Sequence, residues 1–187
     1  EYINTTAGEF PNFKFIEALK NSLDNDSGTI FRFATHENSI LNAIKDQLES
    51  SNCPNKEELI EFIKTITTPR NDELEPWIAT RPMVDLRVVI LDYYYNPLTK
   101  GSNSIKAVLP AILNSCEFLK NKYSNPISKI NLTSLNFESN FKWIKMSDQN
   151  VVNPYKLLPP IFENIDPSKT VDFISGLKSI SDGGAAL

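Results

Sequence analysis

The sequence predicts a protein of the α/β class, in which short apolar strands lead directly into amphipathic helices. Residues 29–48 begin with a run of large apolar side chains and continue as a pattern in which apolar residues recur every three or four positions. Residues 83–91 repeat this order on a shorter scale, because Met83 and Val84 precede Asp85, a residue type that often caps a helix. Two such junctions favour strands and helices mixed within one fold.

Three helices are predicted in the first seventy residues. The first begins near Pro11, since proline is well tolerated in the first turn of a helix, and ends at the turn residues 24–28. The second follows the apolar run and ends near Leu48, and the third covers 56–67 after a break at Pro54. Their apolar faces consist of Phe15, Ile16, Leu19 and Leu23; Ile40, Leu41, Ile44 and Leu48; and Leu59, Ile60, Phe62, Ile63 and Ile66.

The second half contains shorter elements. A helix is predicted from Asp85 towards the tyrosines at 93–95, followed by a turn at 96–101 and a short helix capped by a serine of 102–104. Pro110 either ends that helix or is tolerated at its junction with 111–120.

Residues 121–170 are predicted to be an irregular insertion within a single domain that spans 1–187. Helical periodicity weakens there, prolines recur, and the aromatic residues Phe137, Phe141, Trp143 and Tyr155 are spread singly. A long irregular segment in a compact domain is usually functional or an elaboration of the fold. The last three residues resemble the start of a helix, so we expect the chain to be a piece of a longer protein.

Charge is distributed unevenly along the chain, whose net charge is −4. Residues up to Tyr95 carry −7, residues 96–160 carry +5 from eight lysines against three acids, and the remainder carries −2. An acidic half followed by a basic segment suits carboxylates gathered for cations beside a surface that meets a polyanion. Solvated lysines in loops explain the same pattern without a ligand.

The sequence contains no apolar run near the roughly 18 residues that a membrane-spanning helix needs, and no basic N-terminal region followed by an apolar segment. This pattern argues against a membrane protein and predicts a cytoplasmic one.

Glu37 is the first candidate for chemistry. It lies beside His36, the only histidine, where the apolar run ends and the predicted helix begins. Functional sites of α/β folds usually lie at the carboxyl ends of the strands. The local sequence also has a structural interpretation, and caps are commoner than catalytic carboxylates: Thr35 or Asn38 caps the helix and Glu37 complements the positive end of its dipole.

Five stretches together resemble a bacterial family catalogued as domain of unknown function 2779. They are RFATHENSIL, MVDL, YYYNPLTKGSNSIKAVLPAIL, VVNPYKLLPP and ISDGGAAL, and they occur in the family's order. The resemblance extends from about Phe13 to Leu187. That family is similar to the DnaQ-like 3′–5′ exonucleases of the ribonuclease H-like fold, and its members often carry a Cas4-type nuclease domain elsewhere in a longer polypeptide.

The resemblance implies a mixed sheet flanked by helices and four acidic residues that hold two divalent metals. Two hard cations would stabilise the attacking and leaving oxygens of a phosphodiester. Mg²⁺ or Mn²⁺ suits this role and prefers oxygen ligands. The implied partners are single-stranded DNA or RNA and other domains of the same polypeptide.

The resemblance also implies roles for particular residues. Glu37, four residues before Leu41, matches the second acidic position of the exonucleases, where aspartate is usual, and Asp182 lies near the final acidic motif. Both would ligate metal. His36 would orient a phosphate or water, or be a hydrogen-bonded structural residue beside the turn. Asp85 matches an aspartate that opens a helix, as a catalytic metal ligand or as a structural cap. The predicted phosphate-binding residues are Lys100, Ser102, Ser104 and Lys106, although capping of the helix alone also explains the serines.

One family feature is missing from the sequence. The strand with Asp-x-Glu that supplies the first two carboxylates of the exonucleases has no counterpart in residues 1–28, and we expect it to precede Glu1 in a longer protein. The prediction is a metal-dependent nuclease domain, and the alternative is a catalytically inactive nucleic-acid-binding or structural domain of a larger nuclease protein.

Overall fold

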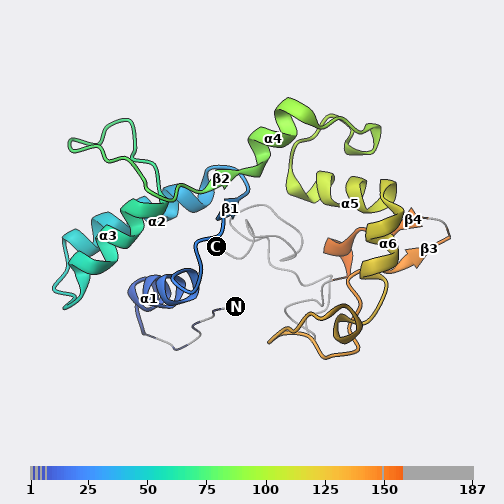
Figure 1. Cartoon of the computed structure of the whole chain (residues 1–187), viewed down its shortest axis with the longest axis horizontal. Helices are drawn as coiled ribbons and strands as arrows, with labels where there is room; N and C mark the ends of the chain where they lie inside the picture. The colour runs from blue at the N-terminus through green and yellow to red at the C-terminus, as the bar shows by residue number, and fades with distance from the viewer. Residues whose placement is uncertain (1, 3, 5, 7, 149, 158–187) are drawn as a thin grey trace, which may run out of the picture. The chain divides into compact units, whose positions relative to one another are not determined.

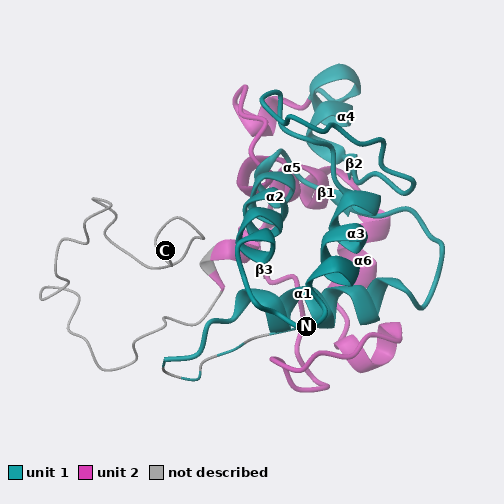
Figure 2. Cartoon of the chain, turned by 90° about the vertical axis from the view of Figure 1, so that its left-hand side faces the viewer, with its two compact units in different colours: residues 1–95 teal, residues 96–187 magenta. Residues whose placement is uncertain are grey.

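The structure of the chain is a computed structural model that describes residues 2, 4, 6, 8–148 and 150–157. The chain divides into two compact units, Glu1–Tyr95 and Asn96–Leu187, each of which is described by itself (Figures 1 and 2). The described residues combine helices with short strands, which confirms the mixed helix and strand class predicted from the sequence.

The body of the first unit consists of three helices, α1 (Asn12–Leu23), α2 (His36–Glu49) and α3 (Lys56–Ile66). Their bounds confirm the three helices predicted from periodicity. The α2 and α3 helices pack side by side, and α1 crosses near their ends and contacts both (Figure 2).

The predicted apolar faces meet in one core between these helices. Leu48 and Ile63 are fully buried from α2 and α3, and Ile16 of α1 packs against them. Burying a large aliphatic side chain stabilises a fold by about 1.5–3 kcal/mol. The buried members of this core are Ile16, Leu41, Ile44, Leu48, Leu59, Ile60, Phe62, Ile63 and Ile66.

A two-stranded parallel sheet lies at the end of this helical body. It pairs β1 (Phe31–Arg32) with β2 (Val84–Asp85), with Phe31 opposite Val84 and Arg32 opposite Asp85. Parallel strands need a long crossover connection, and here α2, α3 and the loop after α3 provide it. The strand is shorter than the predicted apolar run, because only two residues of that run find a partner.

The loop between α3 and β2 is held to the helices by side chains. The Trp77 indole N–H donates to the carbonyl of Thr67 over 2.9 Å. The Arg81 guanidinium donates to the carbonyls of Leu23 and Gly28 and pairs with Asp26 over 2.8 Å. These contacts fix the course of the chain towards β2.

Directly after β2, α4 (Leu86–Tyr93) begins at the predicted position, with Asp85 as its cap. Its sequence is largely apolar, yet none of its side chains is buried among the described residues.

The second unit begins with η1 (Pro97–Thr99) and two consecutive helices, α5 (Ile105–Ser115) and α6 (Glu117–Tyr123). Pro110 lies inside α5, so of the two predicted alternatives the helix continues through it. The helix ends at Cys116, whose extended backbone separates it from α6.

Beyond α6 the described chain contains only short elements. These are η2 (Ile127–Ile130), the antiparallel pair β3 (Met146–Ser147) and β4 (Asn150–Val151), and η3 (Pro154–Lys156). Leu113, Ile144 and Val151 form a small core beneath α5 and α6. The amide oxygen of Asn114 accepts from the backbone N–H of Val151 over 2.8 Å and ties β4 to α5.

Candidate functional site

The two predicted strand–helix junctions lie together at one edge of the first unit. Because β1 and β2 run parallel, their carboxyl ends point the same way, and α2 and α4 both begin there. The site residues predicted at these junctions are His36 and Glu37 at the start of α2 and Asp85 at the start of α4.

Asp85 is the centre of the hydrogen bonding at this edge. Its Oδ1 atom accepts from the backbone N–H of Arg87, which caps α4, and from the backbone N–H of Ala34, both over 2.9 Å. Its Oδ2 atom lies 3.7 Å from Nε of Arg32, and both side chains are largely buried. The structural cap that the sequence left open for Asp85 is therefore present, whereas its catalytic role stays a prediction.

Arg32 is a participant at this edge that sequence reasoning missed. Its Nε and Nη1 atoms are buried without a hydrogen-bond partner among the described residues, so its charge is balanced chiefly by the carboxylate of Asp85. The signal available in the sequence was a basic residue flanked by Phe31 and Phe33. An arginine buried within an apolar run requires a partner of opposite charge, so this position could have been identified.

The connection between β1 and α2 is a tight turn. Ala34 adopts the left-handed backbone conformation with φ of 73°, which is unusual for a residue with a Cβ atom. Thr35 is the N-cap residue of α2 but makes no side-chain capping hydrogen bond. Asn38 does not cap α2 either, because its side chain exchanges hydrogen bonds with the backbone of Thr68 over 2.9 and 3.0 Å.

Glu37 lies in the first turn of α2 with its side chain exposed, beside the exposed His36. A carboxylate at this place complements the helix dipole. Among residues 8–148 and 150–157, the Glu37 carboxylate has no hydrogen bond or ion pair. It is therefore available to a ligand, and its acidic oxygens are of the type that Mg²⁺ and Mn²⁺ bind.

The described part of the chain does not assemble a metal site by itself. No group of three His, Cys, Asp or Glu side chains within it lies close enough to hold a metal ion. Asp182, the second predicted ligand, lies outside the described residues. At this edge, the described residues thus offer the free carboxylate of Glu37 rather than a complete set of ligands.

The predicted phosphate-binding residues belong to the second unit and surround the start of α5. Lys100 and Gly101 both have positive φ and turn the chain after η1. The hydroxyl oxygen of Ser102 accepts from the N–H of Ser104 over 3.3 Å, and that of Ser104 accepts from the N–H of Lys106 over 3.3 Å. Ser104 is therefore the N-cap residue of α5, and Ser102 holds the turn that precedes it. Both lysines are exposed, as phosphate contacts require.

A second charged cluster, which sequence reasoning also missed, centres on Lys45 in α2. Its side chain is almost fully buried, and Nζ lies 2.9 Å from Glu49, 3.3 Å from Asp46 and 3.5 Å from Glu73, below the ring of Trp77. Burial lowers the pKa of Lys45, but the surrounding carboxylates outweigh it and raise the pKa overall. The partners of this ammonium in the described part of the chain belong to α2 and to the loop after α3, so the cluster fastens that loop to α2.

Comparison with known proteins gives one result. Residues 1–104 match the family described as Domain of unknown function (DUF2779). The chain belongs to this family. The DUF2779 match includes the whole first unit and continues to Ser104, so it contains Glu37 and Asp85. Of the five resembling stretches, VVNPYKLLPP and ISDGGAAL lie wholly beyond it, and YYYNPLTKGSNSIKAVLPAIL continues past its end.

No curated protein and no solved structure matches the chain. Within the described residues, no helix is both long enough and apolar enough to cross a membrane.

Proposed function

We propose that this member of the DUF2779 family is a metal-dependent nuclease domain that acts on single-stranded DNA or RNA, in the manner of a 3′–5′ exonuclease with a ribonuclease H-like fold. The observation that carries the proposal is the parallel pairing of β1 with β2. It brings the first turn of α2, with Glu37, and the start of α4, with Asp85, to the carboxyl edge of one sheet, where α/β folds usually bind their ligands.

Glu37 and Asp182 would hold Mg²⁺ or Mn²⁺, which supplies charge stabilisation to a phosphodiester under attack. Glu37 suits this role because its carboxylate is exposed and unpaired among the described residues. The described residues do not complete a set of ligands, and so no catalytic step is assigned to them.

Asp85 has a positioning role in this proposal. Its carboxylate already receives two backbone N–H groups and lies near Arg32, so its acceptor capacity is largely used. By holding the N–H of Ala34, it fixes the turn that places His36 and Glu37 at the start of α2.

The experiment is a cleavage assay with the purified protein and a 5′-labelled single-stranded oligonucleotide, in DNA and RNA form. We expect stepwise shortening from the 3′ end with Mg²⁺ or Mn²⁺ and none with EDTA. Glu37→Gln removes the charge with little change in shape and should abolish shortening. Glu57→Gln is the matched control, because Glu57 occupies the first turn of α3 and is also exposed.

Shortening that persists in EDTA, or that Glu37→Gln leaves unchanged, would overturn the proposal. An effect of Glu57→Gln equal to that of Glu37→Gln would also overturn it, because loss of charge at any helix start would then explain both.

A second candidate function is nucleic-acid binding without catalysis. The observation that favours it is the net charge of +5 in residues 96–160, together with the aromatic side chains Phe137, Phe141 and Trp143. It predicts binding that weakens steeply with salt, proceeds in EDTA and is unaffected by Glu37→Gln, with no shortening of the strand.

A further inference from the structure

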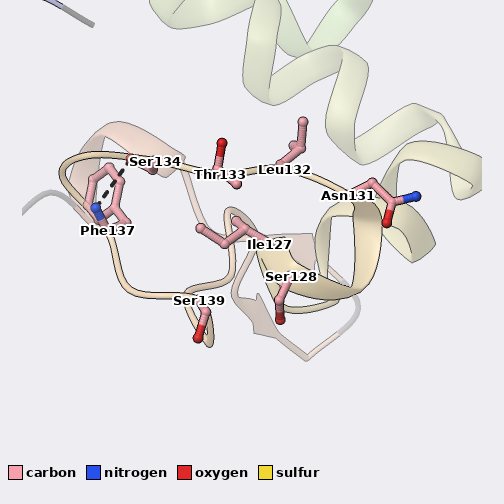
Figure 3. A pocket seen from close by; sticks show the side chains of 8 residues that line it. All are labelled: Ile127, Ser128, Asn131, Leu132, Thr133, Ser134, Phe137 and Ser139. Atoms are coloured by element: carbon pink, nitrogen blue, oxygen red, sulfur yellow. Dashed lines mark hydrogen bonds between the residues drawn. The ribbon is translucent and has the colours of Figure 1, made fainter.

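The second unit contains a pocket of about 440 Å³ that the site described above does not use (Figure 3). Among the described residues, five of the eight that line it carry a hydroxyl or amide side chain, the other three are apolar, and none is charged. The polar members are Ser128, Asn131, Thr133, Ser134 and Ser139, and the apolar members are Ile127, Leu132 and Phe137.

Backbone hydrogen bonds build this pocket. Asn131, with φ of 57°, reverses the chain after η2, and the N–H of Leu132 donates to the carbonyl of Ile127 over 3.0 Å. Across the loop, the N–H of Ser128 donates to the carbonyl of Ser139 over 3.1 Å. The two sides of the loop are therefore tied together independently of the lining side chains, so the pocket is preformed.

One wall of the pocket includes Phe137, whose ring packs against two further aromatic rings. Phe137 stacks on Phe141 with ring centroids 4.1 Å apart and an angle of 21° between the rings, and Trp143 meets both edge-on at 5.2 Å. The hydroxyl oxygen of Ser134 also accepts from the N–H of Phe137 over 3.2 Å, as Figure 3 shows. The position of Phe137 in the wall is thereby restrained.

This lining has a defined chemical preference. Neutral hydroxyl and amide groups provide donors and acceptors without charge, and aromatic and aliphatic side chains favour a flat apolar surface. A nucleobase combines these two properties, and bases of single strands commonly stack on aromatic side chains. A phosphate would need cations in the lining. Lys129 instead follows the pocket residue Ser128 along the chain, and Lys142 lies three positions after Ser139; both suit the backbone of a bound strand.

We infer that this pocket binds a nucleobase of a single-stranded nucleic acid. The inference rests on the substrate class of the proposed function but not on its catalysis. It assigns binding of the substrate strand to residues 127–139, which lie outside the part of the chain that matches the DUF2779 family.

The test compares a labelled oligothymidylate with an abasic oligonucleotide of equal length, which carries the same phosphates without bases. Binding to the full chain is measured in EDTA by fluorescence anisotropy, so that cleavage plays no part. We expect the strand with bases to bind at least about tenfold more tightly, since stacking of one base contributes about 1–3 kcal/mol.

The double variant Thr133→Val, Ser139→Ala removes two pocket hydroxyls that make no side-chain hydrogen bond within the described part of the chain. It should reduce the preference for bases several-fold and leave abasic binding unchanged. Ser147→Ala, on the exposed β3 strand outside the pocket, is the matched control. Phe137→Leu provides a second variant, which removes the stacking surface and should reduce the same preference.

Equal binding of the two strands, or a preference that both pocket variants retain, would overturn the inference. These outcomes are separable from failure of the proposed function. If the protein prefers bases but never cleaves, the pocket inference stands and the nuclease proposal is wrong. If it cleaves without a preference for bases, the nuclease proposal stands and the pocket inference is wrong.

Discussion

The carboxylate of Asp85 accepts a hydrogen bond from the backbone N–H of Ala34, which lies 51 positions earlier in the chain, over 2.9 Å. The same oxygen accepts from the N–H of Arg87 and caps α4. One side chain thus fixes both the turn into α2 and the start of α4, and it also balances the charge of the buried Arg32.

Replacing Asp85 should therefore reduce stability more than loss of a helix cap alone. We expect Asp85→Ala to lower the free energy of unfolding by about 2–4 kcal/mol, because it removes a cap and leaves a largely buried arginine unpaired. Asp85→Asn keeps an acceptor oxygen and should cost less. Urea denaturation followed by circular dichroism measures both variants, and Asp92→Ala on the exposed face of α4 is the control. Equal effects at positions 85 and 92 would contradict the role assigned to Asp85.

Replacing Ala34 with glycine should stabilise the folded protein. Its φ of 73° places it in the left-handed region, where a Cβ atom is unfavourable by about 1–2 kcal/mol. We expect Ala34→Gly to raise the free energy of unfolding by up to about 1 kcal/mol, since the greater freedom of glycine in the unfolded chain offsets part of the relief. Ala43→Gly, in the middle of α2, should instead lower stability by about 0.5–1 kcal/mol. The two alanines thus predict opposite shifts in the denaturation midpoint.

Protonation of Asp46 should account for part of the loss of folding stability in acid. Burial raises the pKa of its carboxyl group, but hydrogen bonds from Arg70 at 2.7 Å and Lys45 at 3.3 Å outweigh burial and hold that pKa below 3.8. Since the folded pKa is lower than the unfolded one, the folded state binds fewer protons. The stabilisation is present above the unfolded pKa and is lost as pH falls through the folded pKa.

Asp46→Asn removes this titration, so we expect a flatter dependence of unfolding free energy on pH between about pH 5 and pH 3. Urea titrations at a series of pH values measure it, with Asp92→Asn as the control for an unpaired carboxylate. A pH profile that Asp46→Asn leaves as steep as before would show that other carboxyl groups dominate acid unfolding.

Arg81 should control the loop between α3 and β2. Its guanidinium bonds to the carbonyls of Leu23 and Gly28 and to Asp26, and these bonds link the end of α1 to the entry of β2. We expect Arg81→Met to lower stability by about 1–3 kcal/mol and to speed limited proteolysis within 68–80. Arg87→Met, on exposed α4, is the matched control and should leave the cleavage rate unchanged.

Periodicity was enough to predict α1, α2 and α3, because each buries one continuous stripe of side chains from near neighbours in the sequence. The capping preference of aspartate, rather than periodicity, was enough to place Asp85 at the start of a helix. The length of β1 was not predictable. Pairing depends on which residues of β2 arrive opposite it, and only Phe31 and Arg32 find partners.

The candidate site was predictable only where it depends on a local pattern in the sequence. Glu37 and Asp85 stand out because each follows a strand and opens a helix, which is a local pattern. The partner of Asp85 does not stand out, since the N–H of Ala34 is a backbone group present in almost every residue. The burial of Lys45 was hidden too, because Glu73 and Trp77, which offset its cost, come from a distant loop.

The parallel pairing of β1 with β2 has a consequence for the order of folding. The helical body is made from segments that adjoin one another along the chain, whereas the strands meet only after both intervening helices have found their places. Long-range contacts of this kind close slowly, because the entropy of the intervening loop is lost before the contacts are gained. We therefore expect the edge that carries Glu37 and Asp85 to be the last part of the first unit to form, and the first part of that unit to open when the protein is heated or treated with denaturant.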